Sequence, residues 1–232
     1  SVIIINLMLP KIGMVPNLQI WATWTKEISI TGLINHVLFL GEYDTDSLLM
    51  VIWSLVHEFR ISIIFPFVVL FLFRVGWKLS VVMASITSIG SFLLIKIFPT
   101  QFTLAISTNY FITLHYLSIF IIGALIAKYR IPLISKFQIK QIKYPLIVIS
   151  FTFYNYTQFP YMIIGKLYKN IDYLLYQILL DWIVCIGGAG ILLSVLGSKV
   201  LSNILLTKPV HFLGKMSYSI YLVHPVVLIT LV

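Results

Sequence analysis

Residues 53–66 read WSLVHEFRISIIFP, and this stretch decides how the rest of the chain is interpreted. It opens a long apolar run, yet it places His57, Glu58 and Arg60 close together near its start. Ionisable side chains are costly to desolvate in a membrane-length apolar segment, so they indicate a functional site. The alternative is a structural ion pair that joins two helices, and the residues alone leave both interpretations open.

If the stretch is helical, its polar residues form two neighbouring stripes. One stripe recurs every fourth residue: Ser54, Glu58 and Ser62. The other follows a spacing of four and then three: Trp53, His57 and Arg60. The spacing therefore predicts that an acid, an imidazole and a fixed cation share one face turned into a helix bundle.

Composition places the whole chain in a membrane. Of its 232 residues, 60% are hydrophobic and only 10% are charged. A soluble domain of this length needs more polar surface, whereas a helical membrane bundle does not. We therefore expect an all-α, polytopic membrane helix bundle with the lipid bilayer as a partner. The net charge of +9 lies in short loops, where anionic lipid explains it better than nucleic acid.

Six apolar runs have a suitable length for membrane crossing. They lie near residues 51–73, 79–98, 103–127, 143–160, 174–197 and 211–232. Residues 1–9 are expected to be the tail of a truncated helix, and residues 11–50 a long loop with a short amphipathic segment at 28–41. The Ser at position 1 and the apolar end predict that 1–232 is part of a single membrane domain that is cut at both ends.

Charge predicts the orientation of these runs. Three alternate connections are basic and carry no acid: Arg74, Lys78, Lys128, Arg130, Lys136, Lys140, Lys143, Lys199, Lys208 and Lys215. The positive-inside rule places these connections in the cytoplasm. All the acids lie on the other side or near its membrane edge, so the Trp53–Glu58 cluster is expected in the extracytoplasmic half of a multi-pass protein of the cytoplasmic membrane.

A second polar stripe crosses the last apolar run. Ser217, Tyr221 and His224 fall on one helical face, as either a site or a Tyr–His packing seam. His115 lies inside the third run, where a hydrogen bond between helices is the expected role and catalysis the alternative. No histidine pair has the spacing of a metal site, and the single Cys185 allows neither an internal disulfide nor a thiolate cluster, so we expect no metal.

Three of these segments resemble a known family, the integral-membrane acyltransferase-3 family. The family pattern W-S-L-x-x-E, followed by a proline, matches here at Trp53, Ser54, Leu55, Glu58 and Pro66. The closing pattern L-G-x-x-S-Y-S-x-Y-L-x-H matches at Leu213, Gly214, Ser217, Tyr218, Ser219, Tyr221, Leu222 and His224. A weaker match is FIIGALIA at residues 120–127. The chain departs from the family wording at Phe59 and Arg60, so the resemblance assigns no role to His57 or Arg60.

The resemblance implies an O-acyltransferase. Its members move an acyl group, commonly acetyl, from cytoplasmic coenzyme A to hydroxyls of extracytoplasmic carbohydrates such as O-antigen, exopolysaccharide or peptidoglycan. The family's main catalytic histidine belongs to a first helix that would precede residue 1. Acetyl-CoA is then a diffusible acyl donor, no cofactor is bound permanently, and the oligomeric state stays open.

The expected site residues fall into three groups. Supporting catalytic roles are expected for Glu58, His57 and Arg60, and substrate binding for Trp53, Ser54, Ser217, Tyr221 and His224. The coenzyme A phosphates are expected on Arg130, Lys136 and Lys140. Two alternatives remain, a transporter or flippase for a polar or lipid-linked substrate and a structural subunit. Against the transporter, no run shows paired helices broken by Gly or Pro.

Overall fold

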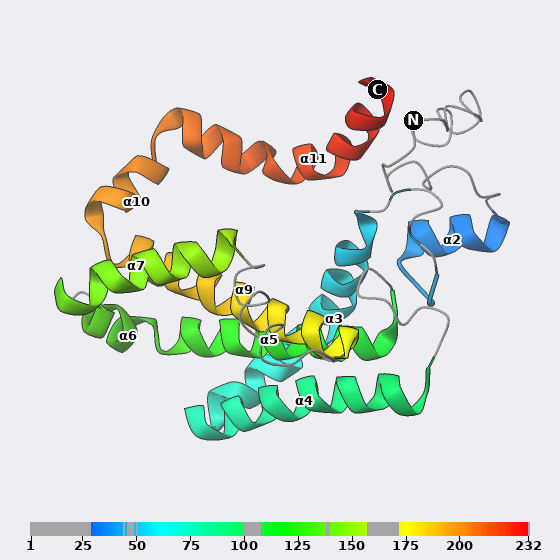
Figure 1. Ribbon diagram of the computed structural model, residues 1–232, viewed down its shortest axis with the longest axis horizontal. Helices are drawn as coiled ribbons and strands as arrows, with labels where there is room; N and C mark the ends of the chain where they lie inside the picture. The colour runs from blue at the N-terminus through cyan, green and yellow to red at the C-terminus, as the bar shows by residue number, and fades with distance from the viewer. Residues whose placement is uncertain are drawn as a thin grey trace.

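The computed structural model of the chain describes residues 29–43, 45, 49, 51–99, 108–137, 140–156 and 172–231. All regular elements in these residues are α-helices (Figure 1). Four of them are long and apolar enough to cross a membrane: α3 (Ile52–Arg74), α4 (Trp77–Ile97), α5 (Tyr110–Lys128) and α9 (Tyr173–Leu196). The predicted all-α membrane bundle is confirmed.

The other two predicted spans form helices, but neither is among the four that are long and apolar enough to cross a membrane. Residues 143–160 correspond to α7 (Lys140–Asn155), whose 16 residues are fewer than the ~20 that a bilayer core needs. Residues 211–232 correspond to α11 (Lys208–Leu231), whose apolar run is interrupted by polar residues such as Lys215 and His224. The predicted helix tail at residues 1–9 lies outside the described residues.

Three short helices complete the described chain. The predicted amphipathic segment forms α2 (Ile30–Leu38), and two basic connections form α6 (Arg130–Phe137) and α10 (Lys199–Leu205). The Ser29 hydroxyl caps α2 by accepting from the Gly32 N–H at 2.9 Å. N-caps of this kind satisfy backbone donors that the first helical turn leaves open.

Small residues allow α4 and α5 to pack closely. The buried positions of α4 recur at helical spacing and are mostly small: Ser80, Ala84, Ser88, Ser91 and Ile95. The Ser91 hydroxyl donates to the Phe111 carbonyl of α5 at 2.6 Å. Small residues and interhelical hydrogen bonds stabilise helix pairs in lipid, where the hydrophobic effect between helices is weak. Next to this pair, Ile61 and Leu72 of α3 join an apolar cluster with Leu117 and Ile121 of α5.

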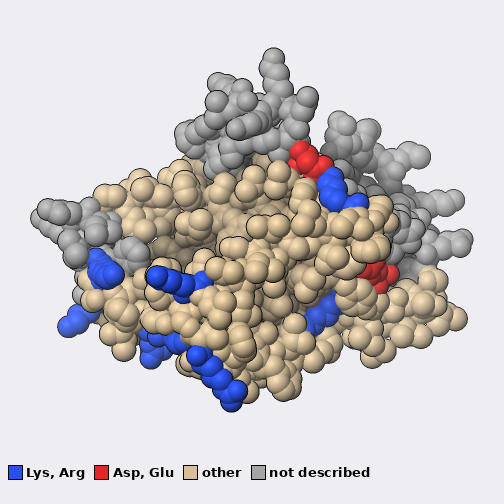
Figure 2. All heavy atoms as spheres, turned by 90° about the horizontal axis from the view of Figure 1, so that it is seen from below, with Lys and Arg blue, Asp and Glu red and all other residues tan. Residues whose placement is uncertain are grey.

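The bundle has two chemically different ends. The basic end comprises the C-terminal ends of α3, α5 and α9 with α6 and α10, and the acidic end carries Glu42 and the Lys96–Asp172 ion pair. On the face drawn in Figure 2, most basic side chains gather toward one end, and the acidic ones lie toward the other with basic side chains near them. The helix α11 crosses apart from the other long helices in Figure 1, and most of its side chains are exposed.

Candidate functional site

The polar head of α3 is folded against α5 at the acidic end. His57 is 2% exposed, and its Nδ1 lies 2.8 Å from the Thr113 hydroxyl of α5. The rings of Trp53 and Tyr116 flank the imidazole, with centroids 6.1 and 5.1 Å away. His57 is thus held in an aromatic pocket between two membrane-spanning helices, directly before Glu58 in the chain.

Arg60 joins three segments of the chain at the same place. Its Nη1 donates to the Thr108 carbonyl at 2.6 Å and to the Thr113 hydroxyl at 3.2 Å, and its Nη2 donates to the Gly41 carbonyl at 2.5 Å. The guanidinium lies 4.2 Å from the centroid of the Tyr110 ring. Since its Nη donors are directed at protein oxygens, Arg60 positions the loop over α3 and α5.

The loop that Arg60 holds is also pinned by Tyr43 and Thr108. The Tyr43 N–H donates to the Thr108 hydroxyl at 2.7 Å, and that hydroxyl donates to the Tyr43 carbonyl at 2.9 Å. Burial raises the pKa of Tyr43 to about 12, and the positive charge of Arg60 partly opposes this. Tyr43 therefore stays a neutral phenol at physiological pH, and residues 41–43 are fixed at this end of the bundle.

Glu58 does not share the inward face of His57 and Arg60. It is exposed on α3, and its backbone carbonyl accepts from the Ser62 hydroxyl at 2.7 Å. The expectation of one face for acid, imidazole and cation is therefore wrong. Successive helical residues point about 100° apart, so burying His57 against α5 turns Glu58 out of that interface.

The two most specific motif segments meet at the open face of α3. The Tyr221 hydroxyl of α11 lies 3.0 Å from the Ser54 hydroxyl and donates to the Val51 carbonyl at 3.1 Å. Glu58 shares this face of α3 because it follows Ser54 by four residues. His224 is exposed beside Tyr221, with its Nδ1 2.7 Å from the Tyr221 carbonyl. Ser217 is exposed and donates to the Gly214 carbonyl at 2.8 Å.

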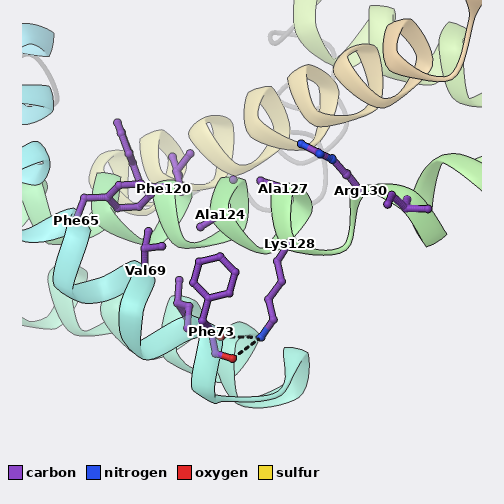
Figure 3. Close-up of a pocket in the computed structure, with 12 residues that line it drawn as sticks. Phe65, Val69, Phe73, Phe120, Ala124, Ala127, Lys128 and Arg130 are labelled. Atoms are coloured by element: carbon purple, nitrogen blue, oxygen red, sulfur yellow. Dashed lines mark hydrogen bonds between the residues drawn. The ribbon is translucent and has the colours of Figure 1, made fainter.

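A separate pocket of about 840 Å³ opens at the basic end between α3 and α5 (Figure 3). Its walls are apolar, with Phe65, Phe73 and Phe120 among them. Lys128 turns away to the end of α3, where its Nζ donates to the carbonyls of Leu72 and Val75 at 2.8 and 2.9 Å. Arg130 lines the mouth on the other side.

Of the three candidates for phosphate binding, Arg130 lies at this mouth. Arg130 and Lys136 are exposed on α6, so their charges are accessible at the basic end. Lys140 begins α7, and its side chain lies outside the described residues. The pocket itself was not expected from the sequence. Two apolar helix faces have the same residue pattern whether they touch or leave a space between them.

Sequence reasoning also missed one polar cluster, deeper in the bundle. His115 Nδ1 lies 3.0 Å from the Ser88 hydroxyl of α4, and His115 Nε2 lies 3.3 Å from a carboxylate oxygen of Asp181 on α9. The hydrogen bond between helices that was expected of His115 is confirmed. Asp181 inside an apolar run was a sufficient sign of a polar partner, but its pairing with His115 depends on how three helices pack.

These features are those of a multi-pass membrane protein built from helices, with a polar cluster at one end and an apolar pocket at the other. A family model described as acyltransferase domain matches residues 8–231. The chain therefore belongs to the acyltransferase-3 family and is an acyltransferase. No curated protein and no solved structure matches it. The family assignment favours the enzyme over the transporter and the structural subunit.

Proposed function

We propose that this membrane acyltransferase moves an acetyl group from coenzyme A, bound at the basic end, to a carbohydrate hydroxyl at the acidic end. The observation that carries the proposal is the contact between Ser54 and Tyr221 at 3.0 Å. It joins the two family motifs from opposite ends of the chain at one face of α3. The aromatic and hydroxyl side chains there suit a sugar, which offers both apolar faces and hydroxyls.

Acyl transfer of this kind needs a base for the acceptor hydroxyl and donors for the oxyanion that forms on the thioester. In the proposal, Glu58 binds sugar hydroxyls or orients the base, because it is exposed beside the Ser54–Tyr221 contact. His224 and Ser217 extend the same surface, and Trp53 packs behind it on His57 and Tyr116. His57 is buried and Arg60 half-buried by contrast, and both are bonded to protein atoms, so they fix the geometry of α3 under the substrate.

The apolar pocket is the proposed place of the donor. Its volume of about 840 Å³ lies within the range of ligand sites. Arg130 and Lys136 are accessible for phosphates, whereas the charge of Lys128 is already used on α3 carbonyls. Arg130→Gln is therefore expected to raise the KM for acetyl-CoA and to leave the KM for the acceptor unchanged.

The test is transfer of labelled acetyl from acetyl-CoA to carbohydrate by membranes that contain the complete gene product. Glu58→Gln keeps the shape of the side chain and removes its charge. We expect its turnover to fall by about two orders of magnitude at a normal protein level, and Ile63→Val, on the exposed side of α3, to leave turnover unchanged. Absence of any acetyl transfer by the wild-type protein would refute the proposal, and normal turnover of Glu58→Gln would remove Glu58 from the site.

A further inference from the structure

The cluster around His115 links three membrane-spanning helices through a directed chain of hydrogen bonds. The Trp182 indole N–H donates to the Ser88 hydroxyl oxygen at 3.0 Å. The Asp181 carboxylate can only accept and faces His115 Nε2, so the hydrogen of the neutral ring is assigned to Nε2. His115 Nδ1 then accepts from the Ser88 hydroxyl. The carboxylate also lies within electrostatic reach of the Tyr116 hydroxyl.

His115 and Asp181 lie close together but do not form a well-aligned hydrogen bond. The two side chains are 3.3 Å apart, yet His115 Nε2 is fully buried and lacks a hydrogen-bond partner of good geometry within the described residues. A small cavity of about 10 Å³ lies beside it, lined in part by Ser91, Tyr116 and Gln177. This is about the volume that one water molecule needs, and its walls offer several polar partners.

The site lies well inside the membrane-spanning helices. With a rise of 1.5 Å per residue, His115 is about 8 Å along α5 and Asp181 about 12 Å along α9 from their acidic ends. Within the described residues the structure gives Asp181 no lysine or arginine partner. The other titratable groups near the pair are Tyr116 on α5 and Cys185 on α9. His57 of α3 lies behind the Tyr116 ring, and α4 contributes only neutral serines.

We propose that His115 and Asp181, with one water in the adjoining cavity, form an intramembrane proton-binding site. An unpaired carboxylate at this depth is costly, and a proton held between imidazole and carboxylate removes that cost without a second charged residue. Ser88 and Trp182 orient the imidazole, and the Tyr116 hydroxyl lies near the carboxylate. The buried Nε2 beside a cavity of the right size separates this arrangement from a closed structural ion pair.

Such a site would serve the acyl transfer, a step that rests on the proposed function. When the acceptor hydroxyl attacks the thioester, a C–O bond forms, the C–S bond breaks, and the hydroxyl proton ends on the thiol sulfur. The hydroxyl oxygen and the thioester carbon have to meet for this attack, so the thioester enters the bundle on its flexible arm while the coenzyme A phosphates stay at the basic end. The His115–Asp181 pair lies between the two ends and would take up the hydroxyl proton and return it to the thiolate that leaves.

The site is tested by pH-difference infrared spectroscopy of the complete gene product in lipid nanodiscs. A protonated-carboxyl band should develop as the pH falls, disappear in Asp181→Asn and persist in Asp172→Asn, which alters a surface acid of the same helix. His115→Gln should move the pH midpoint of the band and carries the test if Asp181→Asn does not fold. A band that persists in Asp181→Asn, or a midpoint that His115→Gln leaves unchanged, would overturn the proposal.

The role in transfer is tested separately by the pH profile of acetyl transfer. If Asp181 carries a proton during transfer, Asp181→Asn should change the shape of the pH profile. If Asp181 makes only a structural contact, the variant should lower the rate by the same factor at every pH. The latter result would overturn the proton-transfer step. Because the infrared band does not require turnover, failure of the proposed acetyl transfer and failure of the proton site can be told apart.

Discussion

The packing of α7 on α9 depends on Gly187 and not on its neighbour Gly188. A Cβ built at Gly187 would lie 2.8 Å from the backbone N of Tyr154 and 2.9 Å from the backbone O of Ser150. At Gly188 the nearest atoms are 4.0 Å away and belong to the Tyr154 ring. Backbone atoms cannot rotate aside, so a methyl group at Gly187 forces the two helices apart, whereas one at Gly188 fits.

The magnitude follows from two opposing effects. An alanine in place of a helical glycine gains about 1 kcal/mol in helix propensity, and this gain is common to both positions. Overpacking a well-packed contact costs about 1–3 kcal/mol and applies to Gly187 alone. Gly187→Ala should therefore be less stable than Gly188→Ala by about 1–3 kcal/mol. Because α9 also carries Asp181 and Trp182, the displaced helix should disturb the His115 cluster as well.

Reversible unfolding in mixed detergent micelles, followed by far-ultraviolet circular dichroism, gives the free energies of unfolding of the two variants side by side. Gly188→Ala is the matched control, since it makes the same chemical change one residue away. Equal free energies of unfolding for the two variants would refute the reasoning, because they would mean that α7 and α9 do not approach as closely as the structure shows.

Four further predictions concern single contacts and the topology. Tyr221→Phe removes the hydroxyl that joins α11 to α3 and should lower the free energy of unfolding by about 0.5–1.5 kcal/mol; Tyr218→Phe, exposed on α11, is the control and should not. Asp172→Ala loses the cap that accepts from Leu174 and Leu175 and should be less stable than Asp172→Asn by about 0.5–2 kcal/mol in the same unfolding assay. The Lys96 hydrogen bond lowers the pKa of Asp172 in the folded state. The ion pair's contribution to stability is therefore complete above about pH 3.9 and should be lost as the pH falls through the lower folded-state pKa. A pH series of wild-type melting temperatures would show this loss. Single cysteines at Val37 and Ser135, in a Cys185→Ser background, test the orientation: an impermeant maleimide should label only Val37→Cys in intact cells, and labelling of Ser135→Cys alone would invert it.

Much of the fold was accessible from the sequence because long apolar runs end at basic or polar turns. The run predicted at 51–73 is α3 at Ile52–Arg74, and the run at 174–197 is α9 at Tyr173–Leu196. The starts of two helices were predicted less well: α5 begins at Tyr110, although its run was predicted from 103, and α7 begins at Lys140, although its run was predicted from 143. In α7, Lys140 and Lys143 looked like a loop, although they form the first turn of the helix.

The orientation of the site could not be predicted in the same way. Periodicity groups residues on a helix face, but the neighbouring helices decide which face is buried. The hydrogen bonds of Arg60 to the carbonyls of Gly41 and Thr108 come from backbone atoms, which leave no trace in a residue pattern. The pairing of His115 with Asp181 likewise requires that α5 and α9 lie parallel and in register.

The sidedness of acetyl transfer tests the central claim most directly. Sealed membrane vesicles of both orientations, containing the complete gene product and its carbohydrate acceptor, would be given labelled acetyl-CoA from outside. The basic end with its apolar pocket predicts that inverted vesicles, which expose the cytoplasmic face, transfer label to carbohydrate in their interior, and that right-side-out vesicles do not. Transfer by right-side-out vesicles alone, or by neither kind, would contradict the account.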